Sequence, residues 1–189
     1  MDVDVDTKGA NERLNNWVAV TVVVISVFLA LSNVKDGNIG QNMALAKADA
    51  VDTWSEYQAT KLKLHLAENS LSQLDIIAST PGIDRALVAR EKARLQGSIA
   101  KYNEKSASLM KDAKDHEAEY DALNVHDDQF DMSEAFLSIG LALSAVAAVT
   151  SLAWLLYVCW GVSAVGMVMG MAGFLHLNLH SDFVARLLG

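Results

Sequence analysis

Two groups of histidine and aspartate residues have the side-chain types that bind metal ions. His126 and Asp131 belong to the first group, and His176, His180 and Asp182 form the second. His176 and His180 are four residues apart, so on a helix both imidazoles would lie on one face and could contact one transition-metal ion, with carboxylates completing the shell. Two histidines at this spacing can instead anchor a helix among lipid headgroups. The two hypotheses for these histidines are therefore a metal site at a membrane interface and an anchor among lipid headgroups.

The charge distribution indicates a membrane protein. Mean hydropathy is +0.21, which is high for a soluble chain of 189 residues. Residues 14–34 and 135–179 contain no Asp, Glu, Lys or Arg, and nearly all the charge lies between Lys35 and Glu134. The net charge of −8, without a dominant Lys/Arg cluster, argues against a nucleic-acid partner.

The first membrane-spanning helix is predicted at residues 14–34, after a polar tail at 1–13. Its uncharged stretch has about the 20 residues that a bilayer core requires. The alternative is a cleaved signal peptide, because Ala30-Leu31-Ser32 resembles a cleavage site. Acidic residues outnumber Lys8 and Arg13 before the span, which is the reverse of a basic signal region, so we interpret it as an uncleaved anchor.

Two further spans are predicted at residues 132–152 and 155–179, followed by a tail at 180–189. The uncharged stretch 135–179 is about twice as long as one span requires, which indicates two helices joined by a turn near residues 150–154. Trp154, Tyr157 and Trp160 cluster there, as aromatic rings do at a headgroup layer. One span, a domain and then two spans would place His126 and His176 on the same side of the bilayer.

Small residues line one face of each of the last two spans. They let another helix approach the backbone closely. Either the two faces pack against each other, or one of them receives another protein. The residues are Gly140 and Ser144 in the earlier span, and Gly166, Gly170 and Gly173 in the later one.

The polar middle, residues 35–131, predicts a long antiparallel coiled-coil-like helical hairpin with its turn near 79–82. Thr80 followed by Pro81 is a typical helix start, although one continuous helix kinked at Pro81 is the alternative. Apolar or small residues recur every three or four positions as two narrow stripes, which is typical of coiled-coil packing. The first stripe contains Met43, Ala46, Ala50, Thr53, Tyr57, Thr60, Leu64, Ala67, Leu71, Leu74 and Ala78; the second contains Val88, Leu95, Ile99, Tyr102, Leu109, Ala113, Tyr120 and Leu123, and is interrupted by Lys92, Ser106 and His116.

No sequence motif predicts catalysis or transport. The chain has no GxSxG, HExxH, CxxC or glycine-rich phosphate loop, and its single cysteine, Cys159, lies within an apolar run. A homo-oligomeric pore would need a polar lining. The spans offer little for one beyond Thr21, Ser26, Ser138, Ser144 and Ser163.

The sequence resembles the bacterial membrane family DUF4337 over nearly the whole chain. The matching segments are Ala48-Asp49-Ala50 through Trp54, Tyr57-Gln58-Ala59, Lys61, His65-Leu66, His126, Phe130-Asp131, Glu134-Ala135 and Leu143-Ser144-Ala145-Val146-Ala147. The resemblance implies one span, a polar helical region and two spans, and no established activity. It also implies an internal amino terminus and a periplasmic hairpin, although the basic turn typical of that family is here the uncharged Thr150-Ser151-Leu152-Ala153.

The sequence thus predicts an all-α membrane protein with three transmembrane helices, one N-terminal and two C-terminal. We expect a non-enzymatic scaffold or accessory subunit of the bacterial inner membrane that contacts lipid, oligomerises or joins a larger membrane complex, and has no cofactor. The alternatives are a metal-binding protein that uses a transition metal ion, and the pore.

Overall fold

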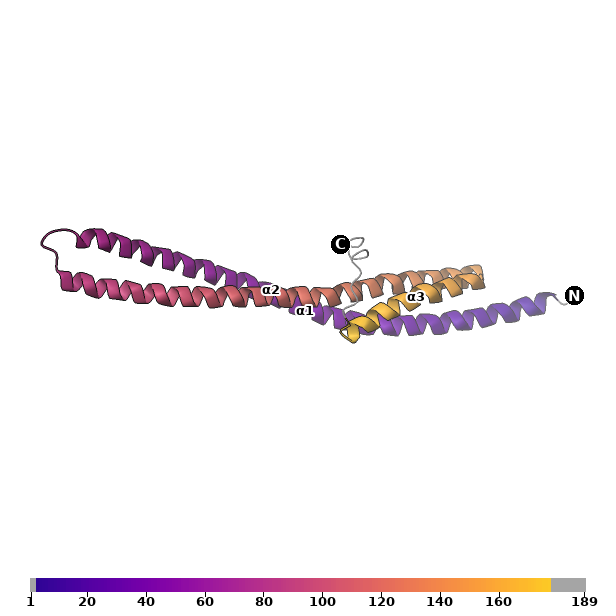
Figure 1. Cartoon of the computed structure of the whole chain (residues 1–189). Coiled ribbons are helices and arrows are strands. Elements are labelled where there is room, and N and C mark those ends of the chain that lie inside the picture. Colours follow the sequence, from indigo (N-terminus) through magenta and orange to yellow (C-terminus); the bar gives the residue numbers. More distant parts are fainter. Residues whose placement is uncertain (1–2, 178–189) are drawn as a thin grey trace. The chain divides into compact units, whose positions relative to one another are not determined.

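The computed structural model describes residues 3–177, with side chains from residue 11 onward, and is entirely helical in its regular structure (Figure 1). It contains α1 (Val3–Ala78), α2 (Arg85–Thr150) and α3 (Ala153–Phe174), and no strand among these residues. The predicted all-α class is confirmed. Each helix contains an apolar stretch long enough to cross a membrane.

The first two helices extend through the boundaries between the apolar and polar segments. Residues 34 and 131 both lie inside continuous helices. The stretch around residue 34 contains Gly37 and Gly40 but no proline. A glycine inside a helix costs only about 1 kcal/mol relative to alanine, whereas proline costs about 3, so the helix continues.

The loop between α1 and α2 covers residues 79–84. Gly82 has φ +88°, a backbone conformation that favours glycine. The Asp84 carboxylate accepts hydrogen bonds from the backbone N–H groups of Ala86 and Leu87, at 2.9 and 3.2 Å, and so caps α2. The prediction that Thr80 caps a helix starting at Pro81 was wrong, because Pro81 belongs to the turn and Asp84 supplies the cap.

The chain divides into two compact units. The arm unit, Ala44–Tyr120, contains the end of α1 and the start of α2, which lie side by side and run in opposite directions (Figure 1). The stripe residues within this unit are all buried or half-buried, with Leu64 at 2% and Ala113 at 0% exposure, so the burial confirms the two predicted stripes. Polar contacts flank the seam: Trp54 with Glu117, Glu56 with Lys105, Asp75 with Lys92, and Lys47 over the Tyr120 ring.

The three polar residues that interrupt the second apolar stripe in the sequence are also buried to some degree. Ser106 is buried, while Lys92 and His116 are half-buried. The Ser106 hydroxyl donates to the backbone carbonyl of Asn103 at 3.0 Å, which satisfies its polar group inside the seam. The exposed ion pairs beside the seam add little stability, since each is worth about 0–1 kcal/mol. Apolar burial therefore dominates this unit.

The span unit contains the remaining parts of α1 and α2 together with α3. Its core has two apolar clusters. Leu14, Val18, Ala147 and Leu156 form one, and Ile25, Leu137 and Cys159 form the other.

Glycines in α2 and α3 allow close helix contact in this unit. A side-chain carbon on Gly170 would lie 2.7 Å from both the Phe28 ring and the Ser133 hydroxyl. One on Gly173 would lie 2.8 Å from the Phe130 ring, and one on Gly140 would overlap Ser163. At these positions the missing side chain leaves room for a Phe ring or a Ser hydroxyl of the neighbouring helix, which is a common use of glycine between membrane helices. Gly166 and Ser144 are buried in the same unit.

Candidate functional site

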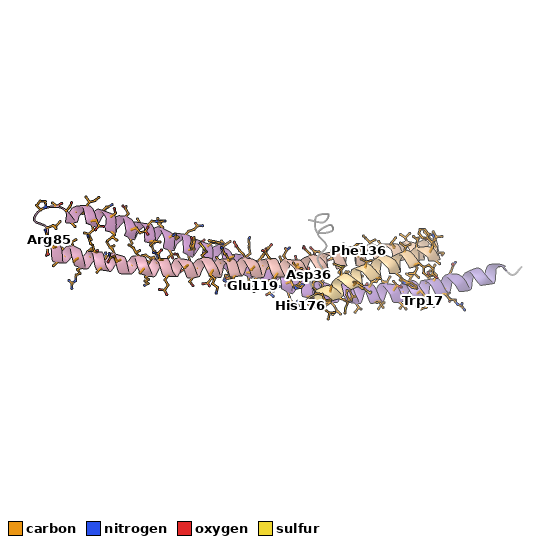
Figure 2. The ribbon with its side chains drawn as sticks, in the orientation of Figure 1. Trp17, Asp36, Arg85, Glu119, Phe136 and His176 are labelled. Atoms are coloured by element: carbon orange, nitrogen blue, oxygen red, sulfur yellow. The ribbon has the colours of Figure 1, made fainter. Side chains whose placement is uncertain are left out.

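Polar residues of all three helical segments meet at one end of the span unit, which we call the junction cluster. Asp36 lies one helical turn after Ser32 on α1, so the two share a face. Asp127 and His126 come from α2. His176 follows the end of α3 (Figure 2). The cluster is completed by Gln129, Asp131, Ser133 and Glu134 of α2.

One residue from each predicted histidine group, His126 and His176, lies in contact with the other. The His126 and His176 rings pack edge to face with centroids 5.0 Å apart. Gln129, which is 1% exposed, donates from its side-chain nitrogen to the Leu177 carbonyl at 2.7 Å and so fixes the chain after α3. The contact confirms that His126 and His176 share one side of the span unit.

The described residues do not assemble a metal site. They include no group of three or more His, Cys, Asp or Glu side chains placed to bind one ion. His180 and Asp182, which the sequence grouped with His176, lie outside the described residues. The observed geometry of His126 and His176 is a ring contact, which stabilises helix packing by itself.

The Asp36 carboxyl group is the most strongly perturbed acid of the cluster. Burial, followed by the nearby negative charges of Asp127 and Asp131, raises its pKa from 3.8 to about 6. Burial also raises the pKa of Asp127, but the hydrogen bond with Asp36 works in the opposite direction there. The two carboxyl groups thus share a hydrogen bond that raises the pKa of Asp36 and opposes the rise in the pKa of Asp127.

Three buried oxygens of this unit have no hydrogen-bond partner within the described part of the chain: Ser32 Oγ, Ser133 Oγ and Asp36 Oδ1. Unsatisfied buried polar groups are uncommon in folded proteins, because each loses its contact with water. The sequence reasoning missed these residues and Asp36. One sequence signal could have identified Asp36. It lies just after the first predicted span, and the order of the helices places that end of the span near Asp127 and Asp131, which precede the second predicted span.

We expect the stability of the protein to fall as pH rises from about 4 to about 6. The folded state keeps the Asp36 proton up to about pH 6, whereas the unfolded state loses it near 3.8, so the stabilisation is complete below the lower value and lost above the higher one. Raised pKa at Asp127 acts in the same direction. One proton gives a slope of up to about 1.4 kcal/mol per pH unit.

Unfolding midpoints in mild detergent across this pH range measure the effect. Asp36→Asn should flatten the slope and raise stability at pH 7, whereas the exposed Asp115→Asn control should leave the slope unchanged. An undiminished slope in Asp36→Asn would show that another group is responsible.

One protein-family model matches most of the chain. The family model described as Domain of unknown function (DUF4337) matches residues 14–176, which cover the arm unit, most of the span unit and the junction cluster. Searches of curated proteins and of solved structures found no match.

Proposed function

The chain belongs to the DUF4337 family, and we propose that it is a non-enzymatic integral membrane scaffold or accessory subunit. In this proposal residues 14–34 of α1, the part of α2 from residue 132 onward, and α3 cross the bilayer. The arm unit is an extramembrane, antiparallel coiled-coil-like hairpin. It oligomerises or attaches to a larger membrane complex.

The apolar surface of the span unit supports insertion into a bilayer. Only 22% of the most apolar 18-residue stretch of α1 is buried within the structure. Val23 and Val27 are 62% and 56% exposed, so in water this face would be a continuous unfavourable patch. In lipid the same residues face hydrocarbon, and the helices satisfy their own backbone hydrogen bonds.

Aromatic residues support a boundary of the hydrocarbon layer at one end of the spans. Trp17 and Trp160 pack edge to face at 6.0 Å, and Tyr157 packs against Trp160 at 5.7 Å. Trp17, Trp154 and Tyr157 are exposed. Exposed Trp and Tyr rings are enriched at the headgroup level of membranes.

The observation that carries the scaffold proposal is the outer face of the first arm. Leu62 and Leu66 are 62% and 57% exposed, and they lie opposite Leu64, which is buried in the seam. Leu45 and Ile76 are also exposed on this arm. Leucines on both sides of a coiled-coil helix favour a second contact, since one partner helix covers only one seam.

The family resemblance supports a bacterial inner-membrane location with a periplasmic arm unit and an internal amino terminus. Local charge does not decide the orientation. Lys8 and Arg13 precede the first span and Lys35 and Lys47 follow it, while Ser151 and Leu152 between α2 and α3 are uncharged.

We expect the protein to resist extraction from membranes by alkaline carbonate, and to purify in mild detergent as an assembly heavier than one chain. Replacing Leu62 and Leu66 together with serine should shift the mass measured by light scattering toward a single copy, because the outer apolar face is lost. A matched variant, Gln58→Ser with Gln73→Ser, changes exposed polar residues of the same arm and should keep the assembly.

Two results would contradict the proposal. Release of the wild-type protein by alkaline carbonate would show that it is not inserted in the membrane. A strictly monomeric particle without co-purifying protein would contradict the scaffold function.

A further inference from the structure

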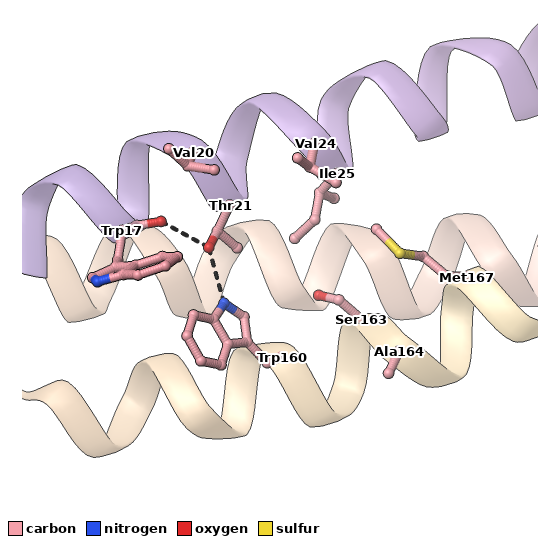
Figure 3. Close-up of a pocket in the computed structure, with 9 residues that line it drawn as sticks. All are labelled: Trp17, Val20, Thr21, Val24, Ile25, Trp160, Ser163, Ala164 and Met167. Carbon is pink, nitrogen blue, oxygen red and sulfur yellow. Dashed lines mark hydrogen bonds between the residues drawn. The ribbon is translucent and has the colours of Figure 1, made fainter.

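An apolar groove opens between α1 and α3 within the span unit (Figure 3). Its volume is about 310 Å³, and its walls include Trp17, Val24, Trp160 and Met167. Small-molecule sites have volumes of about 300–1,000 Å³, so the volume of the groove matches a small ligand better than a whole helix.

The polar atoms lining the groove already bond to one another. The Trp160 indole N–H donates to the Thr21 hydroxyl oxygen at 2.9 Å, and the Thr21 hydroxyl donates to the Trp17 carbonyl at 2.8 Å (Figure 3). Ser163 is 4% exposed and lies 3.9 Å from the Cys159 sulfur. A polar ligand would therefore lose its hydrogen bonds to water without gaining equivalent ones here, whereas a hydrocarbon chain would lose none.

A positive charge lies just beyond one end of the groove. Arg13 precedes Trp17 by one helical turn, and helical residues four positions apart share a face. Arg13 is exposed and forms no ion pair with any residue whose side chain the structure describes. A guanidinium at the headgroup level is suited to bind a phosphate oxygen through charge-assisted hydrogen bonds.

We propose that this groove binds one phospholipid, with an acyl chain between Val24 and Met167 and the phosphate on Arg13. The inference rests on the proposed membrane insertion of the span unit. Arg13 shares a helix face with Trp17, whereas the acidic Glu12 does not, and this placement favours a phospholipid over a neutral hydrocarbon. The hydrogen bonds that Thr21 and Trp160 already make favour an acyl chain over a polar solute.

Native mass spectrometry of the delipidated full-length protein in detergent tests the proposal, with dioleoylphosphatidylglycerol as the probe and dioleoylglycerol as its phosphate-free analogue. The wild type should retain one phosphatidylglycerol per chain and bind the analogue more weakly. Arg13→Gln should weaken phosphatidylglycerol binding about tenfold, as expected for the loss of one charge-assisted hydrogen bond, and leave dioleoylglycerol binding unchanged.

Groove-filling variants test the acyl-chain site separately. Val24→Trp should abolish retention of both probes, because the indole occupies the chain's position. The control Val23→Trp alters the neighbouring residue, which does not line the groove and is 62% exposed, and should retain lipid. Helicity of each variant, measured by circular dichroism, should equal that of the wild type.

Equal binding by the wild type, Arg13→Gln and Val24→Trp would overturn the proposal, since the lipid would then be adventitious. So would a wild type that holds neither probe. If the protein still resists extraction by alkaline carbonate, either result contradicts the lipid site but not membrane insertion. Failure of the lipid-site proposal can therefore be distinguished from failure of the proposed function.

Discussion

Leu64→Ala is expected to lower the free energy of unfolding of the arm unit by roughly 2 to 4 kcal/mol. Leu64 is 2% exposed in the seam between the two arms. Truncating a buried leucine removes its apolar transfer energy and leaves a cavity, and such changes typically cost about 2–5 kcal/mol. A narrow seam has few neighbouring side chains that can move into the space, so little of this loss should be recovered.

The measurement is denaturant unfolding of the full chain in mild detergent, followed by helical circular dichroism. Leu87→Ala is the matched control, because Leu87 is 64% exposed in the same unit. It should change stability by no more than about 0.5 kcal/mol. Equal losses in the two variants would show that the predicted seam does not stabilise the arms.

Gly170→Leu should separate the helices of the span unit and cost about 1–3 kcal/mol or more. Even the first side-chain carbon would lie 2.7 Å from both the Phe28 ring and the Ser133 hydroxyl, one on α1 and the other on α2. Real side-chain carbons essentially never lie so close, so α3 must move away from both helices. The lost contacts would include the edge-to-face packing of Phe28 on Phe174.

Gly161→Leu provides the control on the same helix. Gly161 is exposed and has nothing within 4 Å of its side-chain position. Thermal unfolding in detergent should therefore show a lower midpoint for Gly170→Leu and an unchanged or slightly higher one for Gly161→Leu, since leucine is the better helix former. Comparable midpoints for the two variants would mean that the α3 glycines do not hold the helices together.

Much of the fold could be predicted because the relevant signals are local. Helix follows from composition over long stretches without proline, and the three- and four-residue spacing identifies the buried side of each arm. The stripe residues from Ala46 to Tyr120 are buried or half-buried as this spacing predicts. The start of α2 was predicted less well, since Thr80 and Asp84 are both good caps and only the geometry of the turn at Gly82 selects between them.

The candidate site was only partly predictable. The predicted order of helices brings His126 and His176 to the same end, because two consecutive apolar helical segments that run in opposite directions separate them, and the two rings do make contact. The shared hydrogen bond of Asp36 with Asp127 depends on how α1 is rotated about its axis against α2. No spacing within either helix contains that information.

Local signals are enough to predict that residues 3–177 are mainly helical, which residues form the arm seams, and which stretches are apolar enough for lipid, since each of these depends on neighbours within a few turns. The tertiary structure decided that Asp36 is buried beside Asp127, that Ser32 and Ser133 have their hydroxyls buried, and that a groove lies between Trp17 and Trp160. These features arise where helices distant in sequence approach, and the distance of approach is set by the volumes of side chains on both partners.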